Sequence, residues 1–312
     1  MSSKHIVVLG GTGFVGRHLV ARLCALGHRV TVLSRNRNAQ RELFVLPQAQ
    51  VQTCDVYSQP QLARALKGAD VAINLVGILN EPGRSGRGFE RAHVQLTQGL
   101  IAACGVAGVP RLLQMSALNA GRGSSHYLRT RGQAEAAVRD SKLAWTIFQP
   151  SVIFGRGDGL FARFHALLKF APVLPLARAS AKFAPVYVGD VVAAFTRAVS
   201  DPATQGQTYE LYGPQVLTLA DIVRYTARHA GLRRLVVPLP DALGRLQALA
   251  MDFVPGKPFS TDNYLSLLTD SVGGIDGLYR LGIEKTPLDA IVPDLLHPSG
   301  RQEQLDRYRA GR

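Results

Sequence analysis

Tyr127 and Arg131 form the pair of residues whose types and spacing most directly suggest chemistry. They lie four residues apart in the stretch HYLRTRGQAEAAVRD, for which we predict a helix beginning near Tyr127. Residues at this spacing share one face of a helix. A phenol beside a fixed cation can serve as a general acid or base, and Ser116, eleven residues earlier, could hydrogen-bond a carbonyl group. Arginine keeps its charge but is effectively never deprotonated, so Arg131 cannot join a proton relay as a lysine could.

A glycine-rich turn near the N-terminus indicates what binds beside this pair. Ile6 to Leu9 is an apolar, β-branched run, glycines follow at 10, 11, 13 and 16, and apolar residues then recur at helical spacing. Glycines at such a strand-to-helix turn let the main chain approach a pyrophosphate that rests on the helix N-terminus. The pattern therefore predicts a dinucleotide site, and the alternative is a glycine-rich turn without a ligand. The contacts expected here are Gly10, Thr12, Gly13, Phe14, Val15 and Gly16.

The second predicted strand, Arg29 to Leu33, favours NADP(H) over NAD(H). An NAD-preferring fold usually places a carboxylate just after this strand, whereas an arginine accommodates a 2′-phosphate. No acidic residue occurs between 30 and 41, and Arg35 and Arg37 follow the strand. The alternative interpretation is that both arginines are surface residues of a basic chain.

Further buried strands alternate with helices along the first half of the chain. Strands are expected at 51–54, 70–76, 111–115 and 145–148, with helices at 62–66 and 89–107. This alternation predicts an α/β fold, a Rossmann-type doubly wound parallel sheet, whose ligands lie beyond the carboxyl ends of the strands. The residues expected to contact the cofactor at those ends, in addition to Tyr127 and Arg131, are Asp55, Val56, Leu75, Val76, Gly77, Pro150 and Val152.

The periodicity loosens after Gly155. We expect residues 1–155 to form the NAD(P)-binding domain, with 184–214 returning to its sheet. Residues 156–183 and 215–312 then form a smaller, mostly helical region for a substrate or partner, ending in a basic tail. The apolar segments 161–170 and 243–253 could be a lid, a membrane-facing surface or ordinary core.

Composition narrows the class of protein. The formal charge of +14 favours anionic partners, but no nucleic-acid-binding motif accompanies it, so nucleic acid is not expected. Three scattered cysteines and eight histidines never reach metal-ligand spacing, so we predict reduced thiols and no metal. Because the first strand starts near residue 4 and no apolar run is long enough to span a bilayer, we expect a cytoplasmic protein.

These motifs together resemble the extended and atypical short-chain dehydrogenase/reductases, also grouped as NAD-dependent epimerases/dehydratases. The similar stretches include GGTGFVGRHLV, NLVG, HYLRTRGQAE and QPSVIFGRGD. The last third, PFSTDNYLSLL followed by LGI and TPLDAIVPD, is similar to bacterial relatives of the NADPH-binding accessory subunit of respiratory complex I. In the reductases a Tyr-x-x-x-Lys pair holds the nicotinamide ribose and does the acid–base chemistry, and here Arg131 replaces the lysine.

The resemblance implies an NADP(H)-binding, complex I accessory subunit-like protein with a structural cofactor and a link to quinone metabolism in a respiratory membrane. Its expected partners are a membrane protein complex or an anionic membrane surface, and a quinone-like small molecule; its expected place is cytoplasmic or peripheral on the inner face of the cytoplasmic membrane. Two alternatives stay open. In one, the chain is an active NADP-dependent reductase, epimerase or dehydratase on a hydrophobic carbonyl or quinone-type substrate, with Tyr127 as acid and Ser116 and Arg131 as helpers. In the other, it is a redox sensor that reads NADP(H) without chemistry.

Overall fold

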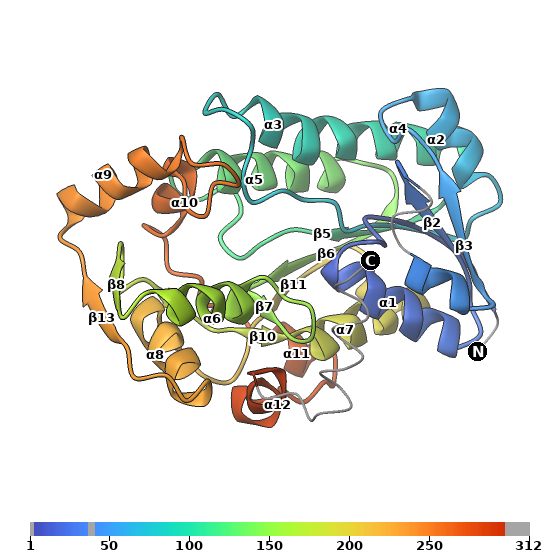
Figure 1. Cartoon of the computed structure of the whole chain (residues 1–312). Helices are drawn as coiled ribbons and strands as arrows, with labels where there is room; N and C mark the ends of the chain where they lie inside the picture. The colour runs from blue at the N-terminus through green and yellow to red at the C-terminus, as the bar shows by residue number, and fades with distance from the viewer. Residues whose placement is uncertain (1–2, 37–40, 297–312) are drawn as a thin grey trace.

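A parallel sheet of seven strands forms the centre of the molecule (Figure 1). The computed structural model describes residues 3–36 and 41–296. The strands are β1 (His5–Leu9), β2 (Arg29–Ser34), β3 (Ala49–Thr53), β4 (Val71–Asn74), β5 (Arg111–Met115), β6 (Ala144–Pro150) and β11 (Gln207–Leu211). Their spatial order is β11-β6-β5-β4-β1-β2-β3, and every neighbouring pair is parallel. The order reverses between β1 and β4, so the predicted Rossmann-type doubly wound sheet is confirmed.

Helices cover both faces of this sheet (Figure 1). One face carries α1 (Phe14–Ala25) and α7 (Val188–Ser200), and the other carries α2 (Gln59–Leu66), α4 (Leu96–Ala107) and α5 (His126–Arg139). Alternate residues of β1 enter the two cores: Ile6 and Val8 pack with α1 and α7, while Val7 and Leu9 pack with α2 and α4. Burial on both faces explains why the strands read as continuous apolar runs in the sequence.

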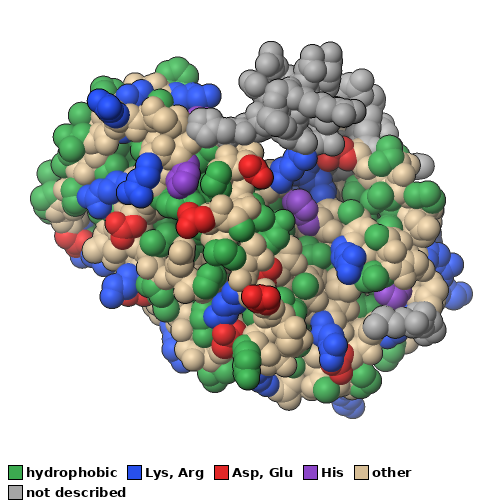
Figure 2. All heavy atoms as spheres, turned by 90° about the horizontal axis from the view of Figure 1, so that it is seen from below, with side chains coloured by type: hydrophobic (Ala, Val, Ile, Leu, Met, Phe, Trp, Pro, Cys, Tyr) green, Lys and Arg blue, Asp and Glu red, His purple; other side chains and the backbone are tan. Residues whose placement is uncertain are grey.

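A smaller region extends from the carboxyl-end side of the sheet (Figure 1). Its helices are α6 (Leu160–Phe170), α8 (Leu219–His229), α9 (Asp241–Met251), α10 (Thr261–Ser266), α11 (Gly277–Arg280) and α12 (Val292–Leu296). Three two-stranded sheets accompany them: β7 (Ile153–Phe154) with β10 (Val186–Tyr187), β8 (Val173–Leu176) with β13 (Leu235–Pro238), and β9 (Lys182–Phe183) with β12 (Leu217–Thr218). Seen from below, the left part of the molecule presents hydrophobic side chains next to several Lys and Arg side chains (Figure 2).

Two predicted elements differ from the structure in ways that have physical causes. The fourth strand ends at Asn74 rather than 76, because the Asn74 side-chain oxygen accepts a hydrogen bond of 3.1 Å from the Val76 amide and turns the chain. The helix predicted over 89–107 begins with α3 (Arg87–Phe89) and a π-helical segment, Glu90–Gln95, before α4. Short π-helical segments often mark functional sites.

The π-helical segment places His93 in the core between two elements of the crevice. The His93 Nε2 atom accepts a hydrogen bond of 3.3 Å from the Ile78 amide, just after β4, and Nδ1 lies 2.8 Å from the Thr130 hydroxyl on α5. Because the Thr130 hydroxyl donates to the His126 carbonyl, Nδ1 must carry the proton, and the ring is neutral. Burial, together with the charge of Arg131, lowers the pKa of His93 to about 2.

We expect His93 to make stability fall as the solution is acidified below pH 6.5. The unfolded chain takes up a proton near this ordinary histidine pKa while the folded chain does not, so the free energy of unfolding falls by up to about 1.4 kcal/mol per pH unit. His93→Gln should be less stable at neutral pH and should lose this slope, as measured by urea unfolding over a pH series. His18→Gln, at a histidine on α1, is the control and should keep the wild-type slope; an equal slope in His93→Gln would contradict the assignment.

Candidate functional site

The glycine turn brings the ends of β1 and β4 into close contact. Gly10 has a φ of +77°, and a Cβ on it would lie 3.0 Å from the Leu75 carbonyl carbon. A Cβ on Gly16 would lie 2.3 Å from the Gly10 carbonyl oxygen. Neither position has room for a side chain, so the two glycines are what allow α1 to begin directly against the strand ends.

The start of α1 has the chemistry of an anion site. Gly13 is the N-cap residue, donates its amide to the Gly10 carbonyl at 3.0 Å, and supplies no side chain to cap the helix. The unpaired amides of a first helical turn carry partial positive charge and bind phosphate groups. Thr12, Phe14 and Val15, which the sequence predicts to contact a dinucleotide, lie in or beside this turn and are partly buried.

Arg131 is buried at the centre of the crevice. Its Nη1 atom donates to the Met115 carbonyl at 3.0 Å and to the Val76 carbonyl at 3.4 Å, so the guanidinium joins the ends of β5 and β4. Its Nη2 atom fills the space beside Gly77, 1.9 Å from where a Cβ would be. The structure thus explains Gly77: any larger residue would displace the guanidinium.

Two buried polar atoms in this part of the crevice have no hydrogen-bond partner among the described residues. They are the Ser116 hydroxyl oxygen and Nε of Arg131 itself, and both residues are more than nine-tenths buried. An unpaired buried polar group costs about 1–3 kcal/mol, so such atoms usually have a ligand or water partner. The two atoms therefore fit a polar ligand seated at the ends of β4 and β5.

Tyr127 lies on the same face of α5 as Arg131, as the spacing predicts. The guanidinium carbon is 5.6 Å from the centre of the Tyr127 ring. The ring also packs edge-on against Phe89 and His93, with centroid separations of 6.3 and 5.6 Å. The phenol is thus held among an aromatic residue, a neutral histidine and a fixed cation.

The other predicted contacts follow strands β2, β3 and β4 at the same edge of the sheet. Arg35 follows β2 and is exposed, and Asp55 follows β3 and accepts the Tyr57 amide at 3.0 Å, with Val56 partly buried beside it. Leu75 follows β4 and is partly buried. Arg37 lies outside the described residues. Ser116 follows Met115, whose carbonyl Arg131 binds, and Arg131 contacts Tyr127. Arg35 and Asp55 follow β2 and β3, which lie beyond β1 in the sheet.

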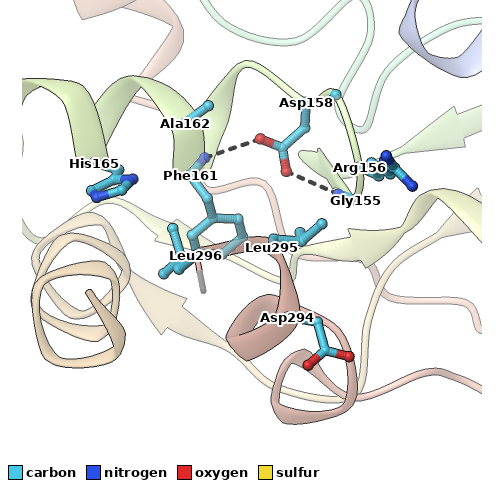
Figure 3. Close-up of a pocket in the computed structure, with 10 residues that line it drawn as sticks. Gly155, Arg156, Asp158, Phe161, Ala162, His165, Asp294, Leu295 and Leu296 are labelled. Carbon is cyan, nitrogen blue, oxygen red and sulfur yellow. Dashed lines mark hydrogen bonds between the residues drawn. The ribbon is translucent and has the colours of Figure 1, made fainter. Parts of the chain in front are cut away.

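Pro150 and Val152 lie at the end of β6, where their carbonyls accept hydrogen bonds from Leu118 and Val186. The nearby Gly155 amide donates to the Asp158 carboxylate at 2.8 Å, and this carboxylate also accepts the Leu160 and Phe161 amides. Burial raises the pKa of Asp158. A pocket of about 190 Å³ lies against this turn, α6 and α12 (Figure 3). None of the predicted site residues lines it, so it is separate from the crevice at Tyr127.

Residues 258–268, which belong to the segment that resembles the complex I accessory subunit, make hydrogen bonds to two elements of the crevice. The Asp262 carboxylate accepts the His126 and Tyr127 amides at 2.6 and 3.2 Å, and so caps α5. The Ser260 hydroxyl donates to the Asn80 side chain at 2.9 Å, and the Asn263 side chain donates to the Leu79 carbonyl at 3.0 Å. These contacts fix the loop after β4 relative to α5.

Sequence reasoning did not single out His93, Asn74 or Asp262 as site residues. Asn74 is buried; its side-chain nitrogen donates to Gln114 and Thr97, and its side-chain oxygen accepts the Val76 amide. A polar residue inside an otherwise apolar strand or helix was the signal available for Asn74 and His93. Asp262 had no such signal, because its contact with α5 spans 136 residues of chain.

Neither a metal cluster nor a membrane span is found in the part of the chain that the structure describes. Residues 3–36 and 41–296 contain no group of three or more His, Cys, Asp or Glu side chains able to hold a metal ion. Within the same ranges, every helix is too short or too polar to cross a membrane.

Comparison with known proteins agrees with this geometry. A family model described as NAD(P)H-binding matches residues 10–159. NADH dehydrogenase (ubiquinone) 1 alpha subcomplex subunit 9, mitochondrial, from Arabidopsis thaliana is 31% identical over 304 residues, which are 90% of this chain and 73% of the relative. A ceramide reductase from Caulobacter vibrioides is 30% identical over 76% of this chain and 74% of that protein.

The fold is shared with solved enzymes at lower identity. A dTDP-glucose 4,6-dehydratase from Streptomyces venezuelae, solved with NAD bound, superposes with a TM-score of 0.74 at 20% identity, over 94% of this chain and 95% of that one. Strand order, glycine turn and NAD(P)H-binding domain all agree with the sequence match over nine-tenths of the chain. The protein belongs to the family of the NADH dehydrogenase (ubiquinone) alpha subcomplex subunit 9.

Proposed function

We propose that this protein binds NADP(H) as a structural cofactor and works as a complex I accessory subunit-like component of quinone-linked respiratory metabolism, peripheral on the inner face of the cytoplasmic membrane. The observation that carries the proposal is the fixed Arg131 guanidinium, which replaces the lysine of a reductase pair. Two carbonyls hold it and it cannot give up a proton at neutral pH, so it suits permanent attraction of a polar cofactor better than proton transfer.

The residues of the crevice fit a dinucleotide in three places. The first turn of α1 would receive the pyrophosphate, and because Gly10 and Gly16 have no side chains, the ligand could approach the main chain there. The unpaired Ser116 hydroxyl and Arg131 Nε would hydrogen-bond the nicotinamide half. Exposed Arg35, with no carboxylate beside it in the sequence, supports NADP(H) rather than NAD(H) because it would pair with the 2′-phosphate.

An active reductase on a hydrophobic carbonyl is the second candidate. It is favoured by Tyr127, whose ring centre lies 5.6 Å from the Arg131 guanidinium carbon, and by the relative named ceramide reductase. When bound, NADPH would supply a hydride to the carbonyl carbon. The Tyr127 hydroxyl would donate the proton to the carbonyl oxygen, and the Ser116 hydroxyl would orient that oxygen.

Arg35→Ala tests the choice of cofactor. Loss of a charge-assisted contact with the 2′-phosphate should weaken NADPH binding about 10- to 100-fold and leave NADH binding nearly unchanged, as measured by calorimetric titration. Arg29→Ala is the matched control, since Arg29 is exposed at the opposite end of the same strand. Equal NADPH affinity in wild type and Arg35→Ala would show that the 2′-phosphate lies elsewhere.

Cofactor retention and turnover separate the two candidate functions. Protein purified without added nucleotide should carry NADPH, and this NADPH should persist when short-chain quinones are supplied, as followed by absorbance of the reduced nicotinamide. Steady oxidation that is lost in Tyr127→Phe, with NADPH affinity retained, would replace the structural function by the reductase. Protein that binds neither nucleotide would exclude both functions.

A further inference from the structure

The two-stranded sheet of β8 and β13 exposes an apolar face at the far end of the smaller region. Val173 pairs with Leu235 and Pro175 pairs with Val237, so these four residues share one side of the sheet, and all four are exposed. Leu235 is 61% exposed, and Phe170, three residues before Val173 on the chain, is 89% exposed. A strand face of this kind normally packs on a core.

Helix α9 continues this face. Leu243, Leu246, Leu249 and Phe253 recur at helical spacing and are all exposed, while Gly244 and Ala248 are the buried residues of the helix. The Gln247 side chain donates to the Pro175 carbonyl at 3.2 Å, so α9 lies directly beside the sheet. We call the four sheet residues, Phe170, the three α9 leucines and Phe253, which follows α9, the apolar tip.

The two stretches of sequence that contain β8 and β13 have basic residues and no acidic ones. Residues 159–189 and 222–240, which include β8 and β13, each contain four Lys or Arg and no Asp or Glu. Lys169, Arg228 and Arg233 are exposed, and within the described residues no ion pair joins them to a carboxylate. The left part of Figure 2 shows Lys and Arg side chains, with some Asp and Glu, next to hydrophobic ones.

Arg178 and Arg224 pair with Asp241 and Asp221, whereas Lys169, Arg228 and Arg233 are exposed cations near the patch without a carboxylate partner among the described residues. An exposed apolar patch next to such cations is complementary to an anionic bilayer surface. Apolar side chains enter the boundary between headgroups and acyl chains, while Lys and Arg meet the lipid phosphates. A core-packing helix would instead bury its leucines, and α9 buries small residues. We propose that the apolar tip is a peripheral docking surface for the anionic lipid bilayer itself. The inference deepens the membrane link of the proposed function but does not depend on the bound nucleotide.

Flotation with lipid vesicles tests the proposal on the full chain. Wild type should bind vesicles of phosphatidylcholine mixed with phosphatidylglycerol, bind phosphatidylcholine alone much more weakly, and lose binding as salt is added. Leu246→Glu combined with Phe253→Glu should weaken binding at least about tenfold, because it places two charges where apolar side chains enter the bilayer. Val106→Glu on α4 is the control, since Val106 is 80% exposed elsewhere, and should bind as wild type.

Charge reversal tests the cationic rim separately. Lys169→Glu combined with Arg233→Glu should weaken binding by about fivefold or more for each cation, and Lys67→Glu, an exposed site on the other half of the molecule, should have little effect. Equal binding to both kinds of vesicle, or equal loss in the controls, would overturn the proposal. Concentration-dependent dimers that Leu246→Glu dissolves, without vesicle binding, would assign the tip to a second copy and also overturn it.

Nucleotide affinity is measured on the same proteins, so that the two ideas fail separately. Tip variants that lose vesicle binding should keep wild-type NADPH affinity. NADPH binding without vesicle binding contradicts only the docking surface. Vesicle binding by a protein that takes up no nucleotide supports the docking surface and contradicts the proposed function.

Discussion

The contact of the Arg131 guanidinium with the carbonyls that end β4 and β5 is the interaction on which the crevice depends. A buried guanidinium loses its hydration, and carbonyl acceptors at 3.0 and 3.4 Å replace part of it. The geometry requires glycine at 77 and fixes the face of α5 that carries Tyr127. The nearby His93 is neutral mainly because burial lowers its pKa, and the charge of Arg131 lowers it further, to about 2.

The sheet was predictable because its signals are local. The central strands β1 and β4 are apolar runs buried on both faces, whereas the edge strand β3 is partly exposed. Gly10 and Gly16 mark the turn at which the chain passes close to the adjacent backbone. The pairing of Tyr127 with Arg131 was predictable for the same reason, since helical spacing alone places them on one face.

Non-local contacts were not predictable in this way. Asp262 reaches the first turn of α5 across 136 residues, and Ser260 reaches Asn80 across 180. Nothing in the periodicity of the 258–268 segment indicates these partners, although the resemblance had marked the segment as specific. The π-helical segment that turns His93 inward was likewise hidden, because an α-helix and a helix with one wide turn have nearly the same apolar spacing.

Further contacts between residues distant in the sequence join the apolar tip to the crevice. Asp252, the C-cap residue of α9, accepts the Thr261 hydroxyl at 2.6 Å and pairs with Arg84 at 3.1 Å, in the loop between β4 and α3. Asp262, the residue after Thr261, caps the helix that carries Tyr127. The C-cap of α9 is therefore connected to the helix that carries Tyr127 through a short series of hydrogen bonds made by Asp252, Thr261 and Asp262. In the proposed docking, a bilayer held by α9 would be coupled to the nucleotide crevice through these contacts.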